Sequence, residues 1–175
     1  MKMYKKLAKP ISYDPRKRSK KDVKYIVIHY TGISNDTAKN EVENFANNNK
    51  REAGAHFFVD RKGKIGRSIT MNRSAWAVGG DRRTGAKGEA KYYNKCTNYN
   101  SVSIELCDCA TKDPSKKQIK AVKKLVKYIK KYCKSAKTII RHWDVNGKEC
   151  PIRMIGQASS TSGKRWTKFK KAISK

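Results

Sequence analysis

The segment that decides the fold is Val23-Lys24-Tyr25-Ile26-Val27-Ile28, a run of β-branched and aromatic residues that ends at His29. Such a run favours a buried β-strand. Two similar runs follow, Ser101–Cys107 and Thr138–Arg141, and the second of them directly precedes His142. Stretches with the 3.6-residue period of amphipathic helices lie between the strands. This alternation predicts an α/β fold: a single domain with a central mixed β-sheet flanked by helices.

Local signals place the other elements. Capping residues open the first two helices, and a Gly-containing turn joins two short strands into a β-hairpin. Residues 79–100 have no useful periodicity, which is typical of a long loop that shapes a functional site. In chain order, the further predicted elements are an extended basic arm over 1–20, a helix from Asn35 or Asp36 to about Asn49, strands over 54–60 and 64–69, a helix from Asp113-Pro114-Ser115 to about Cys133, a flexible loop over 159–163 and a short helix over 164–173.

The charge of the chain indicates what kind of partner it binds and says little about its fold. The chain of 175 residues has 43 Lys and Arg against 14 Asp and Glu, a formal net charge of +29. Nucleic acid, an anionic membrane surface or an anionic cell-wall polymer could match this charge. Lys outnumbers Arg by 32 to 11, which argues against base readout because bidentate recognition of guanine favours Arg.

Two kinds of segment are not found in the sequence. No apolar run approaches the ~20 residues that a membrane span needs. The basic N-terminus is not followed by an apolar stretch of ~7–15 residues, so we expect no signal peptide and a protein made in the cytoplasm. In that compartment the five cysteines are expected to be reduced, and most of them to be small buried hydrophobes.

The chain has three histidines, and two of them mark a candidate site. His29 and His142 follow buried strands, at the edge where open α/β sheets bind ligands. Cys150 lies eight positions after His142, across a turn that contains Gly147. Two His and one Cys with an open fourth position form a known catalytic zinc shell, whereas structural zinc sites need four protein ligands. From spacing alone, a zinc site and ordinary hydrogen-bonded histidines are both open interpretations.

Five motifs then occur in a fixed order between about residues 23 and 151. They are Ile26–Thr31, Ala55–Gly63, Ala75-Trp76, Asn100–Leu106, and Arg141-His142 continuing to Gly147-Lys148-Glu149-Cys150-Pro151. Together these motifs resemble the zinc-dependent N-acetylmuramoyl-L-alanine amidases. That family is shared by phage endolysins, bacterial cell-wall amidases and animal peptidoglycan recognition proteins.

The resemblance implies one zinc ion held by His29, His142 and Cys150, and catalytic roles for Glu105 and Lys148. Zinc lowers the pKa of bound water to about 7. A carboxylate can take the proton of that water and pass it to the leaving amine, and an ammonium group can stabilise the oxyanion. The alternative for Glu105 is an ordinary surface carboxylate. Its place between two apolar strand residues argues against that alternative.

Further residues are candidates for substrate contact, with core packing as the alternative for each aromatic side chain. His56 matches a common family position but is not a standard ligand, so we place it in the wall of the groove or behind the ligands. The chain also departs from the family pattern, because Ala55, Ala77 and Ile152 stand where members often have Tyr, His and a small residue. The candidates for substrate contact are Tyr30, His56, Trp76, Asn100 and Trp143.

The resemblance implies a hydrolase that cuts the amide between N-acetylmuramic acid and L-alanine in bacterial peptidoglycan. We expect a phage or prophage endolysin that reaches the cell wall after release at lysis. Residues 1–175 are expected to form one catalytic domain, with a core of about 22–173 and no separate cell-wall-binding domain. We expect a monomer whose Lys-rich surface holds it on anionic cell-wall polymers, with no specific nucleic-acid partner.

Two other classes of function are open. The first is a module that binds peptidoglycan without cutting it. The resemblance implies that such relatives lose the cysteine ligand, commonly to Ser, so Cys150 favours the enzyme. The second is a basic nucleic-acid or membrane binder with a structural zinc ion. That function needs a fourth protein ligand, and the remaining histidine is not well placed to supply one.

Overall fold

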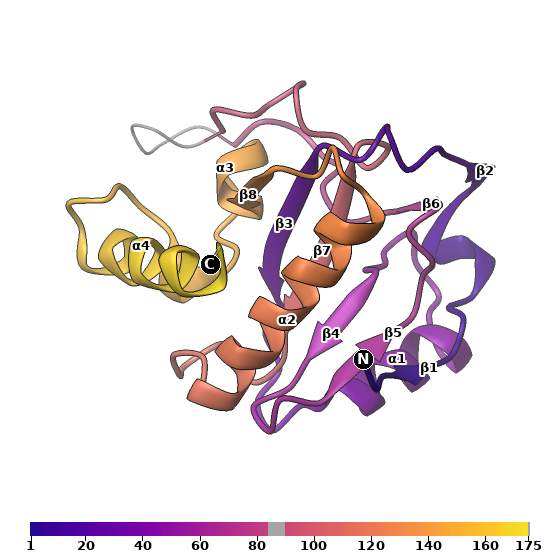
Figure 1. Ribbon diagram of the computed structural model, residues 1–175, viewed down its shortest axis with the longest axis horizontal. Helices are drawn as coiled ribbons and strands as arrows, with labels where there is room; N and C mark the ends of the chain where they lie inside the picture. The colour runs from indigo at the N-terminus through magenta and orange to yellow at the C-terminus, as the bar shows by residue number, and fades with distance from the viewer. Residues whose placement is uncertain (84–89, 175) are drawn as a thin grey trace.

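The computed structural model describes residues 1–83 and 90–174 and has a mixed β-sheet at its centre (Figure 1). Six strands lie in the order β1-β5-β4-β7-β3-β8, and β2 and β6 form a separate two-stranded sheet. The predicted α/β fold is confirmed. The strands are β1 (Tyr4–Lys5), β2 (Tyr13–Lys17), β3 (Tyr25–Tyr30), β4 (Phe57–Val59), β5 (Ile65–Arg67), β6 (Arg73–Ala75), β7 (Ser101–Leu106) and β8 (Thr138–Arg141).

Parallel pairing joins the central strands β4, β7, β3 and β8, and the β4–β5 hairpin is antiparallel, as the sequence predicts. The carboxyl ends of β3, β7 and β8 therefore meet at one edge of the sheet. In the described residues, four α-helices and two short 3₁₀ helices flank the strands. They are α1 (Ala38–Asn47), α2 (Lys116–Tyr132), α3 (His142–Asn146), α4 (Thr161–Ser174), η1 (Pro10–Ser12) and η2 (Ile152–Met154).

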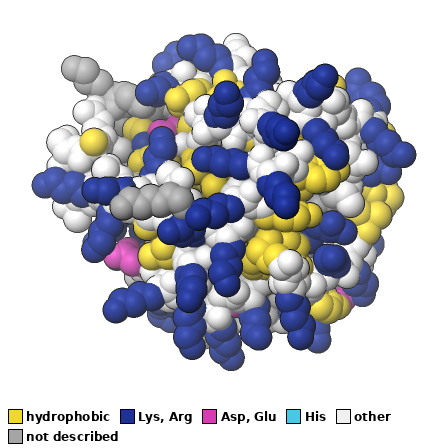
Figure 2. All heavy atoms as spheres, viewed as in Figure 1, with side chains coloured by type: hydrophobic (Ala, Val, Ile, Leu, Met, Phe, Trp, Pro, Cys, Tyr) yellow, Lys and Arg dark blue, Asp and Glu magenta, His cyan; other side chains and the backbone are white. Residues whose placement is uncertain are grey.

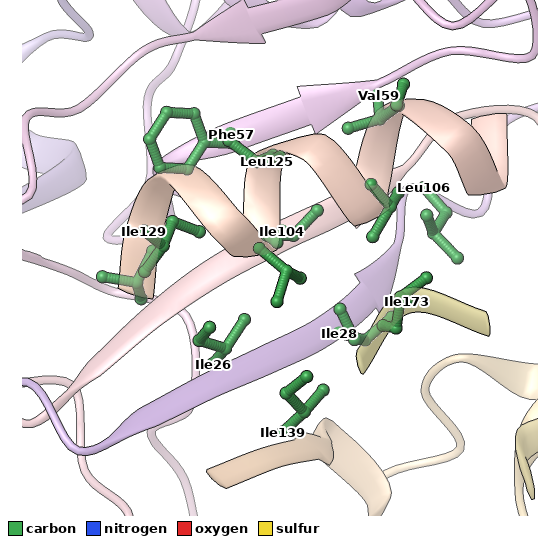
Figure 3. Packing of buried hydrophobic residues seen from close by; sticks show 14 of the residues in the cluster. Ile26, Ile28, Phe57, Val59, Ile104, Leu106, Leu125, Ile129, Ile139 and Ile173 are labelled. Carbon is green, nitrogen blue, oxygen red and sulfur yellow. The ribbon is translucent and has the colours of Figure 1, made fainter. Parts of the chain in front are cut away.

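The two faces of the sheet differ because successive side chains of a strand point to opposite faces. Ile26, Ile28, Ile104 and Leu106 are buried in the main hydrophobic core under α2, and Figure 3 shows them between the strands and that helix. Helix α4 packs beside α2 and adds three apolar side chains to the same core. The alternate residues of β3 and β7 point to the opposite face. The three side chains from α4 are Trp166, Phe169 and Ile173.

Helix α1 covers part of the opposite face. Its Val42 packs in a small apolar cluster with Phe58 of β4. The approach to β5 is so close that a Cβ atom on Gly66 would lie 2.6 Å from the carbonyl oxygen of Ala38 and equally close to a methyl carbon of Val42. Only glycine permits this contact, so Gly66 fixes how α1 sits on the hairpin.

Several predicted boundaries were wrong. Thr37 caps α1, and its Oγ1 accepts the Asn40 amide at 3.1 Å, so neither Asn35 nor Asp36 is the cap. His29 lies inside β3 rather than after it. Helix α4 begins at Thr161, three residues earlier than predicted, because Ser160 Oγ accepts the Gly163 amide at the helix start. Part of the predicted flexible loop is therefore helical.

The basic arm is more than a surface extension. Its first strand, β1, pairs with β5, and β2 pairs with β6, a strand that the sequence analysis did not predict. Tyr13 and Arg18 of the arm are buried. The predicted loop over 79–100 has neither helix nor strand in its described residues, and its residues 84–89 lie outside the described part of the chain.

Within the described ranges, no helix is both long enough and apolar enough to span a membrane. Figure 2 shows Lys and Arg side chains spread over the face that contains α2, with few acidic side chains among them.

Candidate metal centre and active site

Three potential metal ligands converge where β3 and β8 end. The ligand atoms of His29, His142 and Cys150 all lie within 4.8 Å of one another, and the three residues are buried. Nδ1 of His29 is 3.7 Å from Sγ of Cys150, and the two imidazole centroids are 4.7 Å apart. One ligand comes from a strand, one from the first residue of α3, and one from the loop after α3. The structure thus brings together all three residues that the resemblance implies.

Three of the four ring nitrogens of these histidines lack a partner in the described protein, and the fourth, Nδ1 of His29, faces Cys150 Sγ. Nε2 of His29 and both ring nitrogens of His142 are buried without a hydrogen bond. Burial lowers the pKa of His142 to about 3, and burial together with the nearby His142 holds the pKa of His29 well below its usual range. Both rings are therefore neutral at pH 7. Neutral imidazole nitrogens and a cysteine sulfur are the donors that zinc prefers.

The thiol of Cys150 fits the same interpretation. Burial raises its pKa, and the negative charge of Glu105 raises it further, while the Tyr30 amide and the charge of Lys148 oppose the shift. A coordinating cation deprotonates such a thiol outright. Unpaired buried polar groups each destabilise a fold by about 1–3 kcal/mol. A zinc ion would satisfy these groups together, so the donor set fits that metal.

A network around α3 holds two of the ligands in place. Arg141 and Asp144 form a buried ion pair, with Nη2 and Oδ1 2.7 Å apart. The same guanidinium donates to carbonyl groups in loop 154–156. The amide of Trp143 donates to the carbonyl oxygen of Cys150 at 2.8 Å. These contacts tie the start of α3 to the loop that follows it, so they set the separation between the second and third ligands.

Glu105 lies beside the first ligand on the neighbouring strand. The register of β3 and β7 pairs Glu105 with His29, and both point away from the α2 core. Oε2 of Glu105 is buried and has no hydrogen-bond partner among the described residues. Burial raises the pKa of Glu105 to about 8, the charge of Glu41 adds to the shift, and Lys148 opposes it. A carboxyl group with this pKa can hold or release a proton near neutral pH.

Lys148 is exposed at the rim of the site. Gly147 ends α3 in the left-handed conformation, with φ of +80°, and the Lys148 amide donates to Oδ1 of Asn146 at 3.1 Å. The positive charge of Lys148 lowers the pKa of both Glu105 and Cys150. The structure thus places an ammonium group within electrostatic reach of the site.

His56 is not part of the ligand cluster. Its Nδ1 accepts the Ser103 amide at 3.1 Å, which leaves the hydrogen of the neutral ring on Nε2, 3.0 Å from the carbonyl oxygen of Arg73. The Arg18 guanidinium also lies 3.0 Å from Nε2. Burial first, and then the charge of Arg18, lower the pKa of His56 to about 3. Its hydrogen bonds join the start of β4 to β7 and to β6.

The other candidates for substrate contact are dispersed. The Tyr30 ring packs against the α2 core and its amide reaches Cys150. Burial first, and then the nearby charge of Cys150, raise the pKa of the Tyr30 hydroxyl. Asn100 precedes β7, at the opposite end of that strand from Glu105, and its amide group bonds Lys95 and Thr97.

Two tryptophans complete the set of candidates. Trp143 is buried beside Arg141, whose guanidinium carbon is 4.4 Å from the ring centroid. Half-buried Trp76 follows β6, and the next two residues pack on Val27, on the sheet face that carries His29.

A pair of carboxyl groups behind Glu105 was missed. Glu41 of α1 is hydrogen-bonded to Asp36, and burial first, and then Asp36, raise the pKa of Glu41 to about 7. Oδ2 of Asp36 is buried without a described partner. The sequence carried a signal for Glu41, because it shares the apolar face of its helix with Ala38 and Val42.

Comparison with known proteins places this geometry in context. A family model described as N-acetylmuramoyl-L-alanine amidase matches residues 19–153. N-acetylmuramoyl-L-alanine amidase CwlA of Bacillus subtilis (strain 168) is 30% identical over 179 residues, which is 99% of this chain and 57% of that protein. The chain therefore spans little more than half the length of this curated relative.

Solved structures with the same fold cover nearly the whole chain. The structure of PlyL superposes with a TM-score of 0.74 at 25% identity, covering 100% of this chain and 98% of that one. The solution structure of the PlyG catalytic domain gives a TM-score of 0.73 at 27% identity, covering 99% and 93% of the two chains.

Proposed function

Because the chain belongs to the N-acetylmuramoyl-L-alanine amidase family, we propose that it hydrolyses the amide between N-acetylmuramic acid and L-alanine in bacterial peptidoglycan. One observation carries the proposal: neutral His29 and His142, which keep Nε2 of the first ring and both nitrogens of the second unpaired, lie beside Cys150, with Glu105 on the next strand. We propose the role of an endolysin-type lytic enzyme that acts at the bacterial cell wall.

His29, His142 and Cys150 would hold one zinc ion, which when bound acts as a Lewis acid towards the scissile carbonyl and lowers the pKa of water. Glu105 supplies the proton transfers. In its ionised form it takes a proton from the attacking water, and in its protonated form it donates that proton to the leaving nitrogen of L-alanine. A pKa raised towards neutrality suits both roles, because both forms are then populated at working pH.

Lys148 acts through its charge. An ammonium group at the rim of the site stabilises the negative charge that develops on the carbonyl oxygen in the transition state. The same charge favours the ionised form of Glu105. We further propose that Trp76 contacts the substrate, since it is half-buried and the two residues after it pack on Val27, on the sheet face that carries His29.

The charge of the chain suggests how it stays on its substrate. We propose that residues 1–175 form a single catalytic domain that works as a monomer and that its Lys-rich surface binds anionic cell-wall polymers. A net charge of +29 supports this proposal. Binding that rests on exposed lysines weakens as salt shortens the Debye length. The buried ligand cluster is screened much less, so wall binding should fail before zinc is lost.

Digestion of purified cell walls tests the proposed activity. We expect new amino groups without new reducing sugar ends, loss of this activity with a chelator, and its recovery when zinc is added back. New reducing ends would indicate a glycosidase instead. Wall binding without any cleavage by the zinc-loaded protein would indicate a non-catalytic binding module.

A further inference from the structure

A second hollow shares no lining residue with the metal centre. It has a volume of about 1020 Å³ and lies among α2, the start of α1, the β4–β5 hairpin and the first residues of the chain. Figure 1 shows the N-terminus, β1 and β5 near one another at this side of the molecule. We refer to it as the lysine groove, because eight of its lining residues are lysines.

The lysines stand on two sides of the groove. Lys117, Lys120, Lys124 and Lys127 follow one another along α2 at spacings of three or four residues, which places them in one stripe. At 1.5 Å per residue the stripe is about 15 Å long. All four are exposed. Across from them are lysines of the hairpin and of α1, namely Lys62, Lys64 and Lys39.

Little in the described protein neutralises these charges. Asp60 is the only carboxyl group that lines the described groove. Its Oδ1 already accepts the amides of Lys62 and Lys64, each at 2.9 Å, so it is held in the hairpin turn. Within residues 1–83 and 90–174, none of the groove lysines forms an ion pair.

The floor of the groove is apolar and its shape is fixed. Ile65 and Ala121 belong to the main core, and Met3 and Tyr128 pack against it. At one end the hairpin turn meets α2 so closely that a Cβ atom on Gly63 would lie 2.9 Å from the carbonyl oxygen of Lys117. The groove therefore combines cationic walls with an apolar floor, and the hairpin and α2 hold it in place.

We propose that the lysine groove binds a linear cell-wall polymer whose charges are phosphodiesters joined by short polyol units. Lysine ammonium groups are point charges on flexible side chains, which suits binding to a flexible phosphate chain. They do not offer the bidentate donors that recognise nucleotide bases. Charges on two walls of a recess fit a chain better than a flat membrane. This inference rests on the proposed function, because peptidoglycan is where such a polymer would meet the enzyme.

Two variants that lose the same charge test the groove against the general surface field. The groove variant is K117Q/K120Q/K124Q/K127Q. The matched control is K134Q/K137Q/K164Q/K168Q, which removes four exposed lysines that do not line the groove. Gln and Lys have similar helix propensities, so both folds should persist, and thermal unfolding followed by circular dichroism checks this.

Binding of purified poly(glycerol phosphate) is measured over a range of salt concentrations. We expect the groove variant to bind at least ten times more weakly than the parent chain, and the control to change less than threefold. With about 0.7 counterions released per contact on a single strand, the slope of log K against log salt should fall by up to about 3 in the groove variant. Equal losses of affinity in the two variants would overturn the proposal. Binding would then depend on the overall positive charge of the surface and not on the groove.

Two competitors identify the occupant. Single-stranded DNA of matched charge and vesicles containing anionic lipid should each bind more weakly than poly(glycerol phosphate), and with less dependence on the groove. Tighter, groove-dependent binding of either would overturn the assignment to a wall polymer. Cleavage of a soluble muramyl peptide should be equal in all three proteins. Absence of that cleavage in every protein would contradict the proposed function while leaving the binding result to stand.

Discussion

The three buried histidines of this protein fall into two sites, His56 alone and the pair His29 and His142. The two sites are equally buried but differ in their hydrogen bonds. His56 and His142 are both buried, and burial lowers the pKa of each to about 3. His56 uses both ring nitrogens, one towards the Ser103 amide and the other towards the Arg73 carbonyl. His142 leaves both nitrogens without a partner in the described protein, and His29 leaves Nε2 unpaired.

This difference separates a structural histidine from a ligand. A strongly lowered pKa says only that the charged ring is disfavoured, which is true of both clusters. Buried nitrogens without a partner destabilise the protein unless something else binds them. The cluster at the carboxyl ends of the strands therefore indicates a metal site, and His56 is a structural histidine that joins β4 to its neighbours.

The largest expected effect comes from removing the sulfur ligand. Cys150→Ser should abolish zinc binding and lower hydrolysis of cell walls by at least about a thousandfold, because a hydroxyl is a far weaker zinc ligand than a thiolate. Zinc content by atomic absorption and turnover on purified walls measure the two effects. A circular dichroism spectrum like that of the parent would show that the fold is retained.

The control for this variant lies in the other buried thiols. Cys133 is buried in the main core, away from the ligands, so Cys133→Ser should keep both zinc and activity even where it lowers stability. If Cys150→Ser still bound zinc and cleaved cell walls, the assignment of the metal centre would be wrong. His29 and His142 would then be no better supported as ligands than His56.

The second prediction concerns Glu105. Glu105→Gln should retain zinc and lower turnover by about 10²–10⁴, because a general acid–base group contributes on that scale. The amide fills the same volume but cannot exchange the proton. Turnover is measured on walls and zinc by titration with a chelating dye. An unchanged rate would move the proton transfer to another group.

A third prediction tests how the ligands are positioned. Asp144→Asn leaves the buried Arg141 without its ion partner, so we expect a loss of about 3–5 kcal/mol in the free energy of unfolding and zinc affinity about 10–100-fold weaker. Denaturant titration and zinc titration measure the two losses. Arg153→Gln is the control: its partner Asp113 is more than half exposed, so the change should stay within about 1 kcal/mol. Unchanged zinc affinity in Asp144→Asn would show that the network does not position the ligands.

The sequence predicts much of this arrangement because the signals are local. Hydrophobic alternation finds the strands, and the two ligand histidines stand at strand ends. The 3.6-residue period finds α2, and its predicted cap region contains Ser115, whose side chain accepts the Gln118 amide in the structure.

The remaining features depend on contacts between distant parts of the chain. The contact between Arg18 and His56 joins residues 38 positions apart, and no local pattern indicates it. The place of Asn100 depends on strand direction, because a residue before β7 lies at the end remote from Glu105. The place of Trp143 depends on which way α3 leaves β8. These are properties of register and topology, so motif order alone could not assign the substrate contacts.

The smallest effect on activity, and the sharpest test of the comparison, comes from His56→Asn. The folded pKa of about 3 lies below the unfolded value near 6.5, so the folded state binds fewer protons between these limits. His56 therefore stabilises the fold fully above pH 6.5, and this stabilisation is lost as the pH falls towards 3. In the variant, unfolding by denaturant should show lower stability at pH 7, through the lost hydrogen bonds. The gap from the parent should then narrow by up to about 1.4 kcal/mol per pH unit as the pH falls from 6.5.

The difference in unfolding free energy between the variant and the parent, followed over pH, reports on His56 and not on the two proposed ligands. His29 and His142 are present in both proteins, so their own acid sensitivity cancels from the difference. Zinc affinity and turnover at neutral pH should stay within about threefold of the parent, because the hydrogen bonds of His56 go to Ser103 and Arg73 and to none of the ligands. A gap that does not change with pH would mean that His56 is not a buried neutral group. A large loss of zinc would mean that the two clusters act as one site, and unpaired nitrogens would then no longer distinguish a ligand from a structural histidine.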